Sequence, residues 1–157
     1  MIQVGDSIPA VNLTAITGDD QQSDTADKLF AGKKVVLFAV PGAFTPTCSN
    51  AHLPGFVVKA DEIRAKGVDM IACLSVNDAF VMKAWAQAQN AEQLTMLADG
   101  GAAFSEALGL TMPTGDFGGV RSQRFAMIIE DGKVTQLNVE APKTFDVSSA
   151  EAMLALL

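Results

Sequence analysis

The feature of this sequence that most constrains its fold is a continuous apolar run, residues 35–40, which reads Val-Val-Leu-Phe-Ala-Val and ends at Pro41-Gly42. Such a run is typical of a strand buried on both faces, as in a parallel sheet. A second apolar run covers residues 68–76. The residues between the two runs favour a helix from about Pro46 to Ala65, which Pro54 should kink. Strand, helix and strand of this length predict a βαβ unit with parallel strands.

The remaining segments predict a layered α/β domain. Residues 124–130 and 133–139 are apolar runs joined by Asp131-Gly132, a connection that favours a β-hairpin. We therefore expect one domain over residues 1–157, in which helices flank a mixed sheet with a parallel centre and an antiparallel hairpin. The other expected elements are an edge strand at 10–15, a helix at 24–30, a helix capped by Asn77-Asp78 with its apolar stripe at Phe80, Val81, Ala84, Trp85 and Ala88, a strand at 95–98, a helix at 101–107, and a last helix from Ser148 with Glu151 completing a capping box.

The charge and the residue counts exclude several classes of partner. The net charge is −7, which argues against binding to nucleic acid or to an anionic membrane. No apolar run reaches the roughly 18 residues of a membrane helix, and the N-terminus lacks the pattern of a secretory signal. His52 is the only histidine, so zinc and histidine-rich metal sites are not expected. Two cysteines, Cys48 and Cys73, suit a reducing cytoplasm.

The segment Pro-Gly-Ala-Phe-Thr-Pro-Thr-Cys-Ser, residues 41–49, carries the candidate chemistry because it joins a central strand to a helix, where α/β sheets place their sites. Thr45 suits the N-cap and Pro46 the first helical position, which puts Cys48 in the first turn. Unpaired backbone N–H groups and the helix dipole favour a thiolate there, and the thiolate is the nucleophile. The alternative is that Cys48 only fills space in the core.

This segment resembles the active-site motif of the peroxiredoxins, and residues 41–56 resemble the type II (peroxiredoxin-5-like) subfamily in particular. The resemblance extends over nearly the whole chain, through VGDSIPA at residues 4–10, ACLSVNDAFVMKAW at 72–85 and RSQRFAMIIEDGKV at 121–134. It implies a thioredoxin-like fold and an enzyme that reduces hydrogen peroxide and alkyl hydroperoxides with a cysteine thiol. It implies no metal or organic cofactor.

The resemblance also implies roles for individual residues. Cys48 matches the peroxidatic cysteine, Thr45 the threonine that holds the thiolate and the peroxide, and Pro41 the proline that shields the thiolate from water. Arg124 matches the family's arginine, whose charge would favour the thiolate and stabilise the breaking O–O bond. The residues alone do not decide between Arg121 and Arg124. The implied product on Cys48 is a sulfenic acid, which a second thiol must reduce.

Two other residues with reactive side chains, His52 and Cys73, each have competing interpretations. His52 follows Cys48 by four residues, but no residue that would orient a catalytic histidine is recognisable, so we expect a structural role. Cys73 lies in an apolar strand and is either a buried core thiol or a resolving cysteine, as in plant-like type II peroxiredoxins. Its expected place about 10 Å behind the active edge means that a disulfide with Cys48 would require local unwinding.

Two rival functions share the expected fold. A disulfide reductase would usually carry Cys-x-x-Cys, which Cys48 does not begin. A peroxide-sensing relay or binding protein would use the same fold without turnover. The resemblance further implies glutathione with glutaredoxin, or thioredoxin, as reductant, and a homodimer as the assembly.

Overall fold

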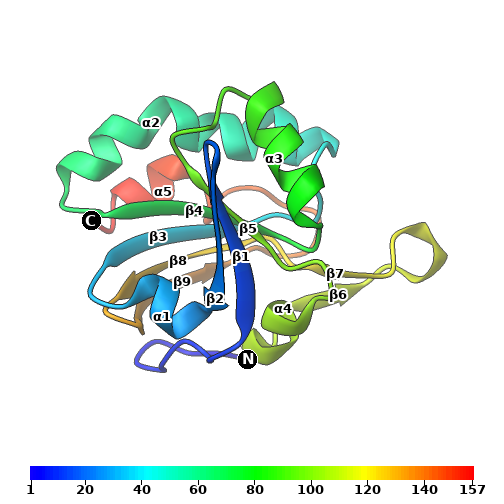
Figure 1. Cartoon of the computed structure of the whole chain (residues 1–157), viewed down its shortest axis with the longest axis horizontal. Coiled ribbons are helices and arrows are strands. Elements are labelled where there is room, and N and C mark those ends of the chain that lie inside the picture. Colours follow the sequence, from blue (N-terminus) through cyan, green and yellow to red (C-terminus); the bar gives the residue numbers. More distant parts are fainter.

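A seven-stranded mixed sheet forms the centre of the molecule in the computed structural model, which describes residues 1–157 (Figure 1). The strand order is β2-β1-β5-β4-β3-β8-β9. The strands β3, β4 and β5 pair in parallel and all other neighbours pair antiparallel, as expected. The seven strands are β1 (Asn12–Thr17), β2 (Asp20–Thr25), β3 (Lys34–Ala39), β4 (Met70–Ser75), β5 (Thr95–Ala98), β8 (Phe125–Glu130) and β9 (Lys133–Val139).

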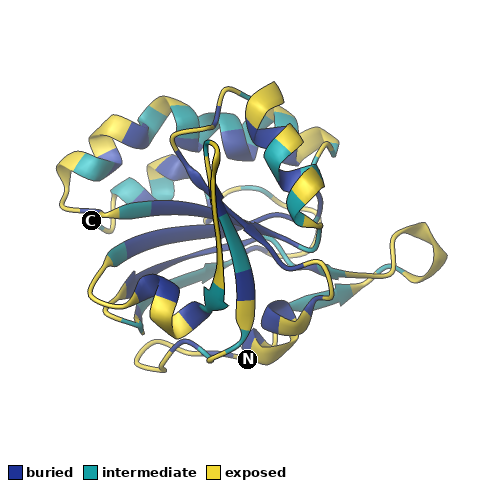
Figure 2. Ribbon diagram, viewed as in Figure 1, coloured by how far each residue is buried: buried dark blue, intermediate teal, exposed yellow.

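Helices cover both faces of this sheet, and β3 shows why. Its alternate residues enter two separate cores: Val36 and Phe38 pack on one face, and Val35 and Leu37 on the other. The first core also contains residues of α2, α3 and α5, and the second contains residues of α1 and α4. In Figure 2 the central strands are accordingly buried along most of their length. The helices are α1 (Ala26–Phe30), α2 (Leu53–Ala65), α3 (Ala79–Ala88), α4 (Ala103–Leu108) and α5 (Ala150–Leu154).

The predicted hairpin is confirmed as β8 and β9. Asp131 and Gly132 both have positive φ, 48° and 80°, as the two central residues of a type I′ turn require. A smaller two-stranded sheet, β6 (Thr111–Pro113) with β7 (Val120–Ser122), projects from the body and carries the short 3₁₀ helix η2 (Gly115–Phe117) at its end (Figure 1). None of the helices is long and apolar enough to span a lipid bilayer.

Four expectations about individual elements were wrong. The first strand is not at the edge, because β2 pairs along its outer side; β2 reads Asp-Gln-Gln-Ser-Asp-Thr and has no apolar pattern that would reveal it. The strand β2 also includes residues 24 and 25, the first two residues of the expected helix at 24–30. On α3 the buried face is Met82, Trp85 and Ala86, whereas Phe80 is 88% exposed. The last helix is capped by Ser149, not Ser148.

Candidate active site

The loop that carries Cys48 leaves the carboxyl end of β3 and turns into a helix at Pro46. Two side chains from neighbouring elements hold this segment. The backbone N–H of Ala43 donates to Oδ1 of Asn77 at 3.0 Å, and Nε1–H of Trp85 donates to Oγ of Ser49 at 3.0 Å. Asn77 lies between β4 and α3, and Trp85 lies in α3, so the cysteine loop is attached to the parallel centre of the sheet. Cys48 itself is 1% exposed.

The irregularity expected at Pro54 takes the form of a π-helical turn, η1 (Cys48–His52), which leads directly into α2. Proline has no N–H, so the carbonyl of residue 50 loses its α-helical donor. Just before it, the N–H of Leu53 donates to the carbonyl of Cys48, a bond between residues five apart. The turn therefore contains one residue more than an α-helical turn. Cys48 and His52 stand at its two ends and are both buried.

Arg124 reaches Cys48 from just before the strand that neighbours β3. It precedes β8, and Phe125 of β8 pairs with Ala39 at the end of β3, so the arginine lies beside the start of the cysteine loop. Its Nη2–H donates to Sγ of Cys48 at 3.1 Å. A guanidinium is always protonated and donates only, so at this distance it stabilises a sulfur anion. Arg121 is not in this position; its guanidinium lies 5.2 Å from the Phe117 ring.

Pro41 and Thr45 lie in the same loop but do not bond to the sulfur. The Thr45 hydroxyl donates to the carbonyl of Gly42 at 2.6 Å rather than to Sγ of Cys48. Pro41 lines a cavity of about 620 Å³ together with Arg124, Thr47 and residues 140–145. Phe145 forms part of its wall, with its ring centroid 5.9 Å from the guanidinium carbon of Arg124. A small molecule entering this cavity would therefore meet the guanidinium that contacts Cys48.

Comparison with known proteins identifies the family of this chain. A family model described as Redoxin matches residues 3–154. Peroxiredoxin-2B of Arabidopsis thaliana is 49% identical over 159 residues, covering 99% of this chain and 98% of its own. The chloroplastic Peroxiredoxin-2E of the same plant is 49% identical and covers 99% of this chain and 69% of its own. The crystal structure of reduced Prx3 from Vibrio vulnificus in complex with H₂O₂ has a TM-score of 0.96, 63% identity and 99% coverage of both chains.

The chain is a peroxiredoxin of the redoxin family. The expected thioredoxin-like fold and the expected type II subfamily are both confirmed, and the enzyme is a thiol-dependent peroxidase.

Sequence reasoning missed the partner of His52 in this peroxiredoxin. The Nη1–H of Arg124 donates to Nδ1 of His52 at 2.8 Å, and Nε2 of the same ring lies 2.9 Å from the carbonyl oxygen of Ser148. Burial, with the charge of Arg124 second, lowers the pKa of His52 to about 3, so the ring is neutral at physiological pH. The spacing of four residues from Cys48 was visible in the sequence. The contact with Arg124, 72 positions away, was not.

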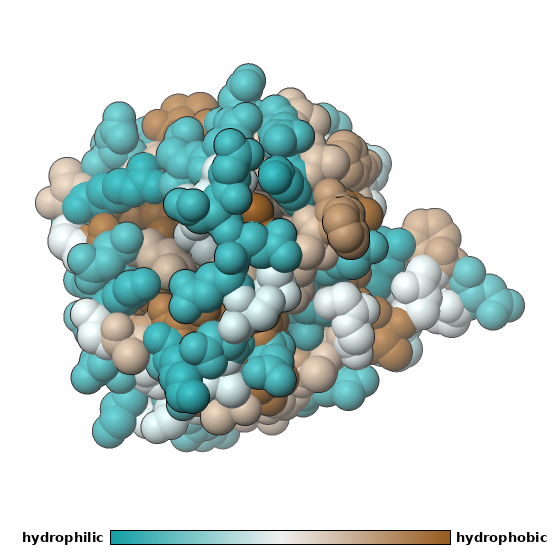
Figure 3. Space-filling view, in the orientation of Figure 1, coloured by the Kyte–Doolittle hydropathy of each residue, from teal (hydrophilic) through white to brown (hydrophobic).

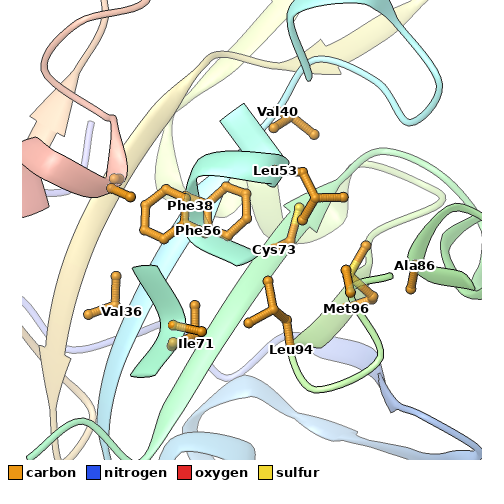
Figure 4. Packing of buried hydrophobic residues seen from close by; sticks show 14 of the residues in the cluster. Val36, Phe38, Val40, Leu53, Phe56, Ile71, Cys73, Ala86, Leu94 and Met96 are labelled. Atoms are coloured by element: carbon orange, nitrogen blue, oxygen red, sulfur yellow. The ribbon is translucent and has the colours of Figure 1, made fainter. Parts of the chain in front are cut away.

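Cys73 is a fully buried thiol in β4, where it pairs with Phe38 of β3 and Met96 of β5. It belongs to the same core as Cys48, and in Figure 4 its side chain lies beside Leu53 of α2. Burial, and then the neighbouring Cys48, raise the pKa of Cys73 well above its ordinary value. The peroxiredoxin therefore holds Cys73 as a neutral thiol, which is a poor nucleophile while the fold is intact.

Proposed function

We propose that this thiol-dependent peroxidase reduces hydrogen peroxide and alkyl hydroperoxides through Cys48, with Arg124 as the residue that activates it. The observation that carries the proposal is the 3.1 Å contact between Nη2 of Arg124 and Sγ of Cys48, together with a cavity that Arg124 lines. A cation at this distance favours the thiolate, and the same guanidinium offers donors to an incoming peroxide oxygen.

The proposed reaction is an in-line displacement. The Cys48 thiolate attacks one peroxide oxygen, an S–O bond forms and the O–O bond breaks. The sulfur is oxidised to a sulfenic acid, and the other oxygen leaves as water or an alcohol after taking a proton from solvent. Negative charge builds up on the leaving oxygen as the bond breaks. A fixed guanidinium beside the sulfur stabilises that charge without having to reorganise.

We propose supporting roles for Thr45 and Pro41. The Thr45 hydroxyl donates its hydrogen bond to the Gly42 carbonyl. The hydroxyl oxygen therefore keeps lone pairs that can accept a hydrogen bond from the peroxide O–H. Pro41 lines the cavity beside Arg124, and its apolar ring would shield the thiolate from water. Neither role requires a metal or an organic cofactor.

A second thiol must return the sulfenic acid to the thiol, and we propose glutathione with glutaredoxin, or thioredoxin, as its source. Attack of the external thiol on the Cys48 sulfur releases water and leaves a mixed disulfide, which another thiol reduces. The full burial of Cys73 and its raised pKa support this external route over closure to Cys73. The comparison that tests it is peroxide turnover with glutathione plus glutaredoxin against turnover with thioredoxin plus its reductase.

We further propose that the 157-residue chain is one domain and that two copies form a homodimer. Bulky apolar side chains remain exposed near the cysteine loop: Phe44 is 56% exposed and Phe80 is 88% exposed. Figure 3 shows an apolar group beside one end of α3 on a face that is otherwise largely hydrophilic. Sedimentation of the wild-type chain and of a Phe80→Ser variant tests the dimer. A monomeric wild-type chain at micromolar concentration would contradict it.

For the compartment we propose the cytoplasm, because the mechanism needs thiols that stay reduced and both cysteines are free. Fractionation of the source cells with antibody detection tests this assignment.

The experiment that tests the function follows hydrogen peroxide loss with purified protein and an excess of reducing thiol. Turnover that requires both the thiol and Cys48 is the expected result. Consumption of a single equivalent of peroxide without turnover would instead favour a peroxide-sensing relay.

A further inference from the structure

We propose that Glu140, Ser148 and His52 form a positioning network that orients the guanidinium of Arg124 toward Cys48. This inference rests on the proposed role of Arg124. It assigns a function to His52 and Glu140, neither of which bonds to the reacting sulfur. Hydrogen bonds join each member of the network to the next.

The first step is the orientation of the imidazole. His52 has no exposed surface, and both ring nitrogens have one partner each. Arg124 can only donate, so Nδ1 must accept, and the carbonyl of Ser148 can only accept, so Nε2 must carry the proton. The two partners therefore select a single neutral tautomer. The lowered pKa of His52 agrees with that assignment.

The second step is the anchor behind the imidazole. Oε2 of Glu140 accepts three hydrogen bonds, from the N–H of Asp146 at 2.7 Å and from the N–H and Oγ–H of Ser148 at 2.9 and 2.7 Å. These bonds hold Ser148, whose carbonyl accepts the hydrogen bond from Nε2–H of His52. The N–H of Glu140 also donates to the carbonyl of Arg124 at 3.0 Å, so the network closes into a ring that begins and ends at the arginine.

The third step concerns the charge of the acceptor. Arg124 forms no ion pair; the four salt bridges of the structure involve other residues. A carboxylate beside Nη1 would also orient the guanidinium, but it would cancel the positive charge that the thiolate needs. A neutral imidazole orients the guanidinium and leaves its charge available to Cys48. This physical difference gives a reason for a buried histidine at this place.

A purely packing role for His52 is the competing explanation, because three aromatic rings surround it. Phe38, Phe56 and Phe145 have ring centroids 4.9, 5.7 and 4.9 Å from the imidazole. His52→Phe preserves an aromatic ring in this cluster and removes the acceptor for Arg124. His52→Gln keeps one acceptor and one donor at the end of a side chain of similar reach. The pair therefore separates packing from hydrogen bonding.

The readout is the rate of Cys48 alkylation by iodoacetamide as a function of pH, followed by peptide mass spectrometry that distinguishes Cys48 from Cys73. We expect His52→Phe to move the midpoint of this pH dependence upward and to slow oxidation by hydrogen peroxide about 10-fold or more. His52→Gln should recover most of both. A His52→Phe protein that is folded, by circular dichroism, and alkylates like the wild type would overturn the assignment.

Glu140→Ala tests the anchor, and Asp99→Ala is its matched control. Asp99 is also a buried carboxylate that accepts two backbone N–H bonds and one hydroxyl bond, from Phe104 and Ser105, but it touches neither His52 nor Arg124. We expect both variants to lose stability and only Glu140→Ala to slow Cys48 alkylation. Equal slowing in the two variants would contradict the network. Alkylation needs no peroxide, so a wild-type protein without peroxidase turnover would refute the proposed function and leave this result standing.

Discussion

Nη2 of Arg124 lies 3.1 Å from Sγ of Cys48, although 76 positions separate the two residues in the chain. The sheet creates this contact, because β8 pairs with β3 in a register that places Phe125 opposite Ala39. The residue before β8 and the loop after β3 therefore meet at one edge. The proposed activation of the thiol by Arg124 thus depends on strand register as much as on the cysteine motif.

Replacing this arginine should impair the peroxide step. Arg124→Ala removes the cation and the donor at the sulfur, so we expect oxidation of Cys48 by hydrogen peroxide to slow by about 100-fold or more. Arg121→Ala should do much less, because that guanidinium packs on Phe117. Stopped-flow measurement of the single oxidation step compares the two. Similar losses in both variants would show that the wrong arginine had been assigned.

The cysteine itself should be indispensable. Cys48→Ser should abolish thiol-dependent peroxide consumption, because a serine hydroxyl at neutral pH does not displace an oxygen from a peroxide. The thermal midpoint should change little, since the two side chains are nearly the same size. Turnover assays on folded protein decide the point, and activity that survives in this variant would remove Cys48 from the mechanism.

The neutral His52 should make the fold sensitive to mild acid. Its pKa is about 3 in the folded chain and near 6.5 when unfolded, so below pH 6.5 the unfolded state binds a proton that the native state lacks. The free energy of unfolding should therefore fall as the pH drops, by about 2 kcal/mol between pH 7 and pH 5. His52→Phe should lack this component. Urea unfolding across this range compares the two proteins, and parallel pH profiles would contradict the prediction.

Cys73 should not matter for the first oxidation of Cys48, and the products of that oxidation show whether it takes part in recycling. Cys73→Ser should leave the oxidation rate of Cys48 nearly unchanged, because Cys73 is fully buried in β4, beside Leu53 of α2 (Figure 4), and forms no hydrogen bond to the sulfur of Cys48. After one equivalent of peroxide without added thiol, we expect the wild-type mass to increase by one oxygen and to convert to a glutathione adduct. A loss of two hydrogens with no free thiols would show a disulfide between the two cysteines.

The fold was largely predictable because the buried strands carry strong local patterns. The run at 35–40 and the Asp131-Gly132 turn each specify their element without help from distant residues. The polar edge strand β2 was not predictable, since its backbone pairing with β1 stabilises it and its side chains carry no hydrophobic signal. On α3 the apolar residues do not all face inward, so Phe80 suggested a stripe that is rotated from the one observed.

The site was predictable only in part. Cys48 could be placed at a helix start from its flanking Thr45 and Pro46, but the choice of Arg124 needed the family resemblance. The contacts of His52 with Arg124 and with the carbonyl of Ser148 join segments that only the folded sheet brings together. Ser148 illustrates the difficulty well. Local rules favour it as a helix cap, whereas its hydroxyl donates to Glu140 and the neighbouring Ser149 caps the helix.

The π-helical turn between Cys48 and His52 sets an unusual limit on how this segment can change through evolution or engineering. Within the turn, Asn50 is exposed and should accept many substitutions. Deletion of any one residue in the turn, by contrast, would restore the α-helical spacing. Cys48 would then rotate about 100° around the helix axis relative to α2. The thiol would then no longer face Arg124. Chain length in these five positions is therefore under tighter constraint than residue identity.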